Sequence, residues 1–426
     1  MTVHPILSAL RKHKSGVVLI ALQIALTLAI VCNAIFIIGQ RIERVNRATG
    51  LDESNLFLVT QSWVGAPTGV DSASVDKLDS LQKEDLATLR QIPGVVSVTP
   101  TNSLPLLRSS WNGVVSTKPS IEFKDKGSYQ RAAYYFLDQH GLATLGLKLV
   151  AGRNFTASEI GNRAARSTIA TPAIIITQTL AKKVFGDGQA LGETLYLNGQ
   201  SAPVRVIGIV ARMQTPSPGQ GADAFDFSSV IVPERLDAGF SRYAVRTQPG
   251  QLDSVMDQAA SALYKANPMR VLDDDSIKSF ADIRAEAYKG DIGMAILMGI
   301  ICLILIAITA AGIVGLTSFW VGQRRKQIGV RRALGATRRD ILRYFQAENL
   351  MIAGGGAVLG IALAVGLNLY LMQHMEMARL PIPVVLARVR PVLILAQAAV
   401  SLPARHPAAV PPPLPTSPMG VRCQRT

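Results

Sequence analysis

The chain has 426 residues, of which 49% are hydrophobic and only 17% are charged, and its formal net charge is +15. A positive mean hydropathy together with so little charge is unusual for a soluble domain and favours an integral membrane protein. The basic excess would also suit a nucleic-acid-binding protein, but it is confined to segments beside apolar runs and has no interleaved aromatic platform, so membrane topology explains it better.

The first apolar run covers residues 16 to 39, contains no charged residue and follows a basic segment at residues 1 to 15. It exceeds the roughly 20 residues that a helix needs to cross a bilayer. The alternative is a cleaved signal peptide, whose apolar region would be only about 7 to 15 residues long and would end at a small-x-small site. We therefore predict an uncleaved transmembrane helix over 16–39.

The long segment over residues 40 to 289 is nearly neutral, with 27 basic and 25 acidic residues, and contains no cysteine. No disulfide can therefore form within it. Lys and Arg are retained on the cytosolic side in short loops, whereas long domains are translocated largely regardless of charge. We therefore expect this segment to be external and the basic N-terminus at residues 1 to 15 to be cytosolic.

The external segment alternates between helical and strand patterns. Residues 84 to 100 predict a helix, a break and a β-branched strand, and residues 173 to 186 predict a strand followed by a short helix. Residues 203 to 210 predict a further strand, and residues 242 to 268 repeat strand, turn and helix. The expected fold is α+β, with small sheets covered by helices on one face.

The two ends of this external segment, at residues 40 to 51 and 279 to 291, have helical propensity. They predict a stalk that continues the first two membrane helices, although solvated linkers would have a similar composition.

Two further charge-free runs, at residues 292 to 322 and 350 to 372, predict transmembrane helices over 290–322 and 350–372. The 20 residues from 324 to 343 carry eight basic side chains and one acidic side chain. The positive-inside rule therefore places the loop at 323–349 in the cytosol.

The cytosolic loop contains signals for a helix, a tight turn and a second helix. Gly335 is placed as the residue that ends the first helix. Thr337 and Asp340 match a capping box, so the second helix should begin directly after Thr337. These signals alone favour a positive-inside loop with incidental caps over a docking element.

The loop sequence "RRKQIGVRRALGATRRDILRYFQAENL" resembles the cytoplasmic loop of the MacB/FtsX superfamily of ABC transporter permeases. The residues that match the family core are Ile328, Gly329, Val330, Arg331, Arg332, Ala333, Leu334, Gly335 and Ala336. Position 327 is Gln, where the family usually has Glu. A second block, at residues 145 to 155 and 176 to 210, resembles the MacB-like periplasmic core, so the resemblance covers roughly residues 16 to 372.

The resemblance implies a multi-pass protein of the bacterial inner membrane with its large domain in the periplasm. It also implies that residues 327 to 336, from Gln327 to Ala336, dock on an ABC ATPase, which binds ATP and Mg while this chain binds no cofactor. No phosphate-binding loop of the Gly-x-x-x-x-Gly-Lys-Ser/Thr type occurs, so we expect the ATPase to be a separate chain. The other implied partners are the lipid bilayer, a second permease in a homodimer or heterodimer, and a periplasmic adaptor.

Direct catalysis and metal binding have little support in the sequence. The five histidines show no zinc-ligand spacing, and no Gly-x-Ser-x-Gly nucleophile motif occurs. His140 is the only histidine of the external segment, and we expect it to be a surface or hydrogen-bonded residue. The run at Asp273, Asp274 and Asp275 suggests an exposed acidic turn more than a cation site, because adjacent carboxylates rarely converge on one ion.

Gly356 and Gly360 form a Gly-x-x-x-Gly motif in the third span, which allows another helix to approach closely within the subunit or across a dimer.

The resemblance fails beyond this span. Residues 380 to 402 would form a degenerate fourth span, because they contain two arginines and three prolines, and residues 403 to 426 form a proline-rich tail. A truncation or frame disruption near residue 384 would explain this end, and a marginal span with snorkelling arginines is the alternative.

Two functions fit these observations. In the favoured one, the chain is an ABC permease that transmits ATP-driven motion to its periplasmic domain, a mechanotransmission that exports or extracts a hydrophobic substrate (lipid-linked, peptide or drug-like). The chain itself is then a transport subunit and not an enzyme. In the alternative, the chain is a membrane-anchored regulator or sensor that controls a periplasmic partner such as a cell-wall hydrolase.

Overall fold

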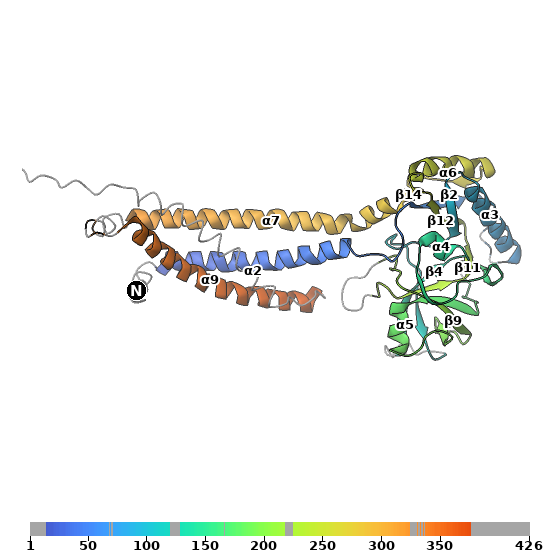
Figure 1. The fold of residues 1–426 in the computed structure, drawn as a ribbon, viewed down its shortest axis with the longest axis horizontal. Coiled ribbons are helices and arrows are strands. Elements are labelled where there is room, and N and C mark those ends of the chain that lie inside the picture. Colours follow the sequence, from blue (N-terminus) through green and yellow to red (C-terminus); the bar gives the residue numbers. More distant parts are fainter. Residues whose placement is uncertain are drawn as a thin grey trace, which may run out of the picture. The chain divides into compact units, whose positions relative to one another are not determined.

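The computed structural model describes residues 14–67, 69, 71–119, 128–165, 167–217, 225–323, 330, 333, 335 and 337–375. The contacts divide the chain into two units (Figure 1). The first, here called the helical unit, comprises Met1–Val45 and Asp291–Thr426. The second, here called the inserted unit, is Asn46–Gly290. The predicted fourth span at 380–402 and the tail at 403–426 lie outside the described residues.

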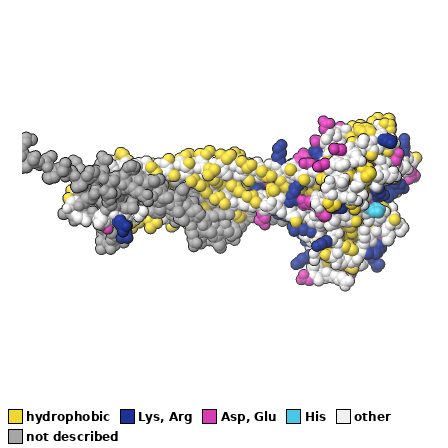
Figure 2. Space-filling model, turned by 45° about the horizontal axis from the view of Figure 1, so that its top comes forward, with side chains coloured by type: hydrophobic (Ala, Val, Ile, Leu, Met, Phe, Trp, Pro, Cys, Tyr) yellow, Lys and Arg dark blue, Asp and Glu magenta, His cyan; other side chains and the backbone are white. Residues whose placement is uncertain are grey.

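Three long helices carry the apolar runs: α2 (Lys14–Val45), α7 (Phe280–Gln323) and α9 (Arg338–Met375). Their stretches at Gly16–Val45, Phe280–Leu316 and Gln346–Tyr370 are long and apolar enough to cross a membrane. Hydrophobic side chains cover the visible described surface of these helices, whereas Lys, Arg, Asp and Glu gather on the inserted unit (Figure 2). The predicted fold, with three clear spans and a large domain between the first two, is confirmed.

The helices extend beyond the predicted spans in the segments that flank the inserted unit. Helix α2 continues to Val45, and α7 already begins at Phe280. The start of α7 is capped by Ser279, whose hydroxyl accepts a hydrogen bond from the Asp282 amide at 3.1 Å. The helical propensity of residues 40 to 45 and 280 to 291 is therefore expressed as helix.

The sheet lobe, as we call the part of the inserted unit that is built from both of its ends, is an antiparallel sheet with two helices on one face. Its strands run in the order β13-β1-β12-β2, and β14 also pairs with β1. The bounds are β1 Leu56–Trp63, β2 Val95–Pro100, β12 Phe240–Thr247, β13 Arg270–Val271 and β14 Ile277–Ser279, with helices α3 Ser72–Arg90 and α6 Leu252–Ala266. The core forms where Phe57 and Val245 of the sheet meet Leu89 of α3 and Leu263 of α6. Apolar residues two positions apart in the strands, such as Phe57 and Val59, and helical spacing in α3 and α6 account for this layer.

The barrel lobe, as we call the part of the inserted unit between β2 and β12, is a mixed sheet that closes on itself. Its order is β5-β9-β7-β10-β4-β3-β8, and β8 pairs again with β9. The strands are β3 Asn112–Ser116, β4 Gln130–Phe136, β5 Leu149–Gly152, β7 Ala173–Thr177, β8 Thr194–Leu197, β9 Pro203–Val210 and β10 Ser229–Val232. The remaining elements are α4 Gly141–Leu145, η1 Ala157–Glu159, α5 Gln178–Phe185, and the parallel pair β6 Gly161–Ala164 and β11 Glu234–Asp237.

The closed ring of strands corrects the architecture that was expected for the barrel lobe. The sequence predicted small sheets covered by helices on one face, which describes the sheet lobe but not the barrel lobe. Side chains from several strands, including Tyr134, Ile174 and Val206, form one buried cluster in the barrel lobe, to which α5 contributes Leu180. The prediction failed because the pairing of β3 with β8 joins residues about 80 positions apart, at Val115 and Leu197, and no local pattern reports such a pairing.

Candidate functional site

The predicted ATPase-docking segment is described only in part. Val330 and Ala333 are helical and exposed, and Gly335 has a φ of +95°, a conformation that favours glycine and ends a helix. Seven of the predicted docking residues lie outside the described residues, namely Gln327, Ile328, Gly329, Arg331, Arg332, Leu334 and Ala336. The docking role of the segment therefore stays a prediction.

The predicted capping box at the start of α9 is present. The Asp340 amide donates to the Thr337 hydroxyl at 3.3 Å, and the Thr337 amide donates to the Asp340 carboxylate at 3.0 Å. These hydrogen bonds hold the pKa of Asp340 below its ordinary value, the Thr337 hydroxyl being the largest cause. The helix therefore begins at Arg338, as expected from Thr337 and Asp340, and the turn between α7 and α9 ends at a defined residue.

Gly356 and Gly360 pack against α2 of the same chain. A Cβ atom added at Gly356 would lie 2.8 Å from the carbonyl oxygen of Ala21, and one added at Gly360 would lie 2.9 Å from the carbonyl oxygen of Ala25. Both distances are too short for a real Cβ contact, so only glycine allows the two backbones to approach this closely. The structure thus places the Gly-x-x-x-Gly face at an intrasubunit contact between α9 and α2.

Neutral polar side chains join α2 to the other two spans. The hydroxyls of Thr27 and Thr309 lie 2.7 Å apart, and the Asn33 side-chain amide donates to the carbonyl oxygen of Ala364 in α9 at 3.1 Å. Thr27, Thr309 and Asn33 are all buried. The sequence analysis missed these contacts, although uncharged polar residues within an apolar run are a usable signal for contact between helices.

An ion pair connects α2 and α7 within the helical unit, near the end of α2 that leads into the inserted unit. Arg41 pairs with Asp291, and the Arg44 guanidinium lies 3.8 Å from the same carboxylate. Together with the Thr27–Thr309 contact, this pair links α2 and α7 at two levels. A displacement of one helix would therefore be resisted by the other.

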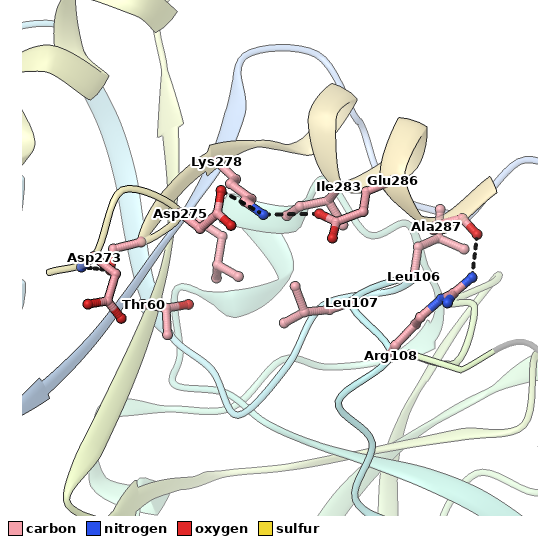
Figure 3. Close-up of a pocket in the computed structure, with 12 residues that line it drawn as sticks. Thr60, Leu106, Leu107, Arg108, Asp273, Asp275, Lys278, Ile283, Glu286 and Ala287 are labelled. Carbon is pink, nitrogen blue, oxygen red and sulfur yellow. Dashed lines mark hydrogen bonds and ion pairs between the residues drawn. The ribbon is translucent and has the colours of Figure 1, made fainter. Parts of the chain in front are cut away.

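The inserted unit contains a cavity of about 370 Å³ beside the first two turns of α7 (Figure 3). Four segments line it. They contribute Leu58 and Thr60 from β1, Leu106, Leu107 and Arg108 from a loop, Asp273, Asp275, Ser276 and Lys278 from the acidic turn and β14, and Ile283, Glu286 and Ala287 from α7. The size falls within the range of small-molecule sites.

Charged groups surround an apolar floor in this cavity. Lys278 lies between two carboxylates, with its Nζ atom 3.2 Å from Asp275 and 3.0 Å from Glu286 (Figure 3). Hydrogen bonds to Glu286 and then Asp275 raise the pKa of Lys278. On the other side, Arg108 donates to the carbonyl oxygen of Ala287 at 2.9 Å (Figure 3).

This cavity was not predicted from the sequence, although part of its rim was. The three aspartates at Asp273, Asp274 and Asp275 form an exposed turn, as predicted. Within the described part of the chain, no group of three or more His, Cys, Asp or Glu residues has the geometry of a metal site. The run Pro105, Leu106, Leu107 in a loop was the other available signal for the cavity.

Two buried polar clusters stabilise the inserted unit. In the sheet lobe, Arg270 pairs with Asp85 at 2.8 Å, Tyr243 donates to Asp85 at 2.8 Å, and the guanidinium lies 4.7 Å from the centre of the Trp63 ring. Arg270 also donates to Gln61 at 2.6 Å. Burial raises the pKa of Asp85, although Arg270 and the hydrogen bonds oppose that shift.

The second cluster connects α3 with β11 through two carboxylates. Asp79 accepts from Arg235 at 2.6 Å and pairs with Lys83 at 2.5 Å, while Gln82 donates to Asp237 at 2.9 Å. Burial, and then the neighbouring charge of Asp79, raise the pKa of Asp237 to about 7. The pKa of Asp79 shifts the other way. Burial is its largest single influence and would raise it, but Arg235 and Lys83 together outweigh burial and hold the pKa of Asp79 below its ordinary value.

These observations define a multi-span membrane protein that carries a large two-lobed domain between its first two spans. The chain matches the family model of the MacB-like periplasmic core domain over residues 18–262 and that of the FtsX-like permease C-terminal over residues 299–404. The first match covers more than half of the chain. The chain therefore belongs to the MacB/FtsX-like family of ABC transporter permeases, as the resemblance in the cytosolic loop predicted.

Individual relatives agree with this assignment. The ABC transporter permease YknZ of Bacillus subtilis (strain 168) is 27% identical over 260 residues, which cover 59% of this chain and 61% of that protein. The macrolide export ATP-binding/permease protein MacB of Bdellovibrio bacteriovorus is 27% identical over 301 residues, covering 67% of this chain and 41% of that protein. The chain thus spans less than two thirds of the length of either relative.

Among solved structures, the extracellular domain of the transporter YknZ from Gram-positive bacteria is similar to this chain. The match has 17% sequence identity and a TM-score of 0.31, and it covers 52% of this chain and 98% of that domain.

Proposed function

We propose that the chain is the permease subunit of an ABC transporter in the bacterial inner membrane, and that it couples ATP hydrolysis by a separate ATPase to motion of its inserted unit. The substrate is a hydrophobic or amphiphilic compound exported or extracted at the outer side of the membrane. The ATPase binds ATP and Mg and docks on residues 327 to 336. A second permease chain and a periplasmic adaptor complete the assembly.

The observation that carries this proposal is the continuity of α7. The helix runs without a break from Phe280, in the inserted unit, to Gln323, directly before the docking segment. Ile283 and Glu286 in its first two turns line the cavity of the inserted unit. One helix therefore connects the surroundings of this cavity to the segment that would receive the ATPase stroke.

The packing of α9 supplies a second route for the same motion. The helix begins at the capped turn after Thr337 and contacts α2 through Gly356 and Gly360. Because these contacts are made with backbone atoms, α9 cannot shift toward α2 without displacing it. A movement at the cytosolic turn would therefore reach α2 and α7, the two helices that flank the inserted unit.

The test is recruitment of the partner ABC ATPase. We expect Leu334→Asp to abolish copurification of the ATPase, because a carboxylate would be buried without a partner at a packed contact. Gln323→Asp is the matched control, since it places the same charge at an exposed position outside the docking segment, and it should copurify as the wild type does. Unchanged copurification of the ATPase with Leu334→Asp would overturn the docking proposal.

A second measurement separates transport from regulation of a periplasmic partner. ATP hydrolysis by the reconstituted complex should rise with a transported amphiphile in a transporter. Activation of a cell-wall hydrolase, without substrate-stimulated ATP hydrolysis, would instead identify the chain as a membrane-anchored regulator.

A further inference from the structure

The floor of the cavity beside α7 is apolar and already buried in the folded chain. Leu58, Leu106 and Ile283 are at most 3% exposed, so the apolar surface that a ligand can reach belongs to the half-buried Leu107 and Ala287. Leu107 and Thr60 lie between the two charged sides in the close-up view (Figure 3). An aliphatic or aromatic group that enters this cavity would exchange water for hydrocarbon surroundings, which is favourable in proportion to its apolar area.

The rim carries more negative than positive charge. Asp273, Asp275 and Glu286 contribute three carboxylates, whereas Lys278 and Arg108 contribute two cations. Lys278 is shared by Asp275 and Glu286, and within the described residues no hydrogen bond or ion pair is made by the Asp273 carboxylate. The acidic side of the rim therefore attracts a cation, and Arg108 on the other side disfavours one there.

The loop that closes one wall is held in an unusual backbone conformation. Leu106 has a φ of +70° and Arg108 a φ of +60°, values that non-glycine residues rarely adopt. The loop keeps this shape because the Arg108 amide donates to the carbonyl oxygen of Pro216 and its guanidinium reaches Ala287. Backbone strain of this kind is concentrated at ligand clamps and switch regions.

We propose that this cavity binds a small amphiphilic amine. Its apolar body lies on the half-buried side chains of Leu107 and Ala287, and its ammonium group lies at the acidic side of the rim formed by Asp273, Asp275 and Glu286. Because Ile283, Glu286 and Ala287 belong to α7, the bound amine contacts the helix that continues into the second span. This inference deepens the proposed function by naming the substrate class, and its role in transport rests on that function, whereas the binding itself does not.

The test uses the full chain in phosphatidylcholine nanodiscs, without ATPase, and three probes of equal chain length: octylammonium, octanol and octanoate. Binding is measured by calorimetry, with empty nanodiscs as the reference for partition into lipid. We expect octylammonium to bind more tightly than octanol and octanoate to bind most weakly. Equal affinities for the three probes would overturn the proposal.

Two sets of variants locate the site. Ala287→Trp should fill the cavity and lower the affinity for octylammonium by about tenfold or more. Ala285→Trp, on the exposed side of the same helix, is the matched control and should bind as the wild type does. Asp275→Asn with Glu286→Gln should weaken octylammonium binding by about fivefold and leave octanol unchanged, because only the charge attraction is removed.

The outcomes distinguish this proposal from the coupling proposal. Wild-type affinity in Ala287→Trp, with circular dichroism showing both tryptophan variants folded, would overturn the site and leave ATPase docking untouched. The variant Leu334→Asp, which should lose ATPase recruitment, should bind octylammonium as the wild type does. Binding of a lysine-bearing peptide without any binding of octylammonium would also contradict a small-molecule site.

Discussion

The inserted unit and the helical unit bury polar side chains in different ways. The sheet lobe encloses a fully buried ion pair, Asp85 with Arg270, that is surrounded by hydrogen-bond partners. In the middle of the spans, α2 instead meets its neighbours through neutral groups and close backbone packing, as at Thr27 and Gly360.

The surroundings explain the difference. A folded domain in water can surround a buried charge with polar partners that its own strands supply, whereas a charge at the centre of a bilayer costs about 2.5 to 3.5 kcal/mol on the insertion scale. Helices in lipid associate mainly through close packing and few hydrogen bonds. The inserted unit should therefore be most sensitive to the loss of one charge, and the helical unit to added volume.

The largest effect is expected from Arg270→Met. The substitution leaves Asp85 buried without its cation and should lower the free energy of unfolding by about 3 to 5 kcal/mol. Urea denaturation of the full chain in detergent, followed by near-ultraviolet circular dichroism, measures it. The surface pair of Arg153 and Glu159 provides the control, since Arg153→Met should leave the free energy of unfolding nearly unchanged.

The double variant Arg270→Met, Asp85→Leu sharpens this result. Removing both charges should recover part of the lost stability, because the unpaired buried charge is then absent. If the double variant is less stable than Arg270→Met alone, the cost lies in packing and not in the unpaired carboxylate.

Gly360→Leu tests the helical unit. The added side chain would collide with the carbonyl oxygen of Ala25 and with Leu28, so α9 should separate from α2 at a cost of about 1 to 3 kcal/mol. Gly366→Leu is the matched control, because a Cβ atom there meets nothing within 4 Å. Resistance to unfolding by dodecyl sulfate, followed by circular dichroism, compares the two, and equal resistance would show that the α2 contact is not close-packed.

A pH dependence is expected from Asp237. Its pKa in the folded chain, about 7, lies above the ordinary value of 3.8. The contribution of this group to stability is therefore full below pH 3.8 and is lost as the pH rises toward 7. Asp237→Asn should remove this part of the decline, measured as the free energy of unfolding between pH 4 and pH 8.

Asp79, Lys83 and Arg235 face Asp237 and supply an internal check. Because its pKa is lowered, Asp79 contributes stability that is present above pH 3.8 and is lost on acidification. Asp79→Asn should therefore change the acidic limb of the profile and not the decline toward pH 7. An identical decline in the wild type and in Asp237→Asn would exclude Asp237 as its source.

The smallest effect is expected from Thr27→Val. It removes the hydroxyl that meets Thr309, and interhelical hydrogen bonds in membranes contribute about 0.6 kcal/mol on average. Thr309 keeps its hydrogen bond to the carbonyl oxygen of Leu305, which limits the loss. Thr27→Ser retains the hydroxyl and should resist dodecyl sulfate as the wild type does, and a loss as large as that of Gly360→Leu would contradict the ranking.

The local elements of the inserted unit were accessible from the sequence because each has a short-range signal. The strand at Pro203–Val210 was predicted to the residue, and the strand and helix over residues 173 to 186 are observed as β7 and α5 with Gly186 after them. Of the candidate sites, the sequence supplied the docking segment and the Gly-x-x-x-Gly face. It did not supply the cavity, because four segments between Leu58 and Ala287 meet there only after folding.

The sequence by itself determined the number and order of the clear spans, the insertion of a large α+β domain after the first span, the basic loop and the capped start of α9 at Thr337. These features follow from composition, hydrophobic length and hydrogen bonds between residues three or four apart. Only the tertiary structure decided that β8 closes the barrel lobe, that Gly356 and Gly360 face α2, and that Asp85 meets Arg270. Each of these depends on contacts between residues about 80 to more than 300 positions apart, and the free energy of such contacts is set by packing and desolvation in three dimensions, which no local pattern encodes.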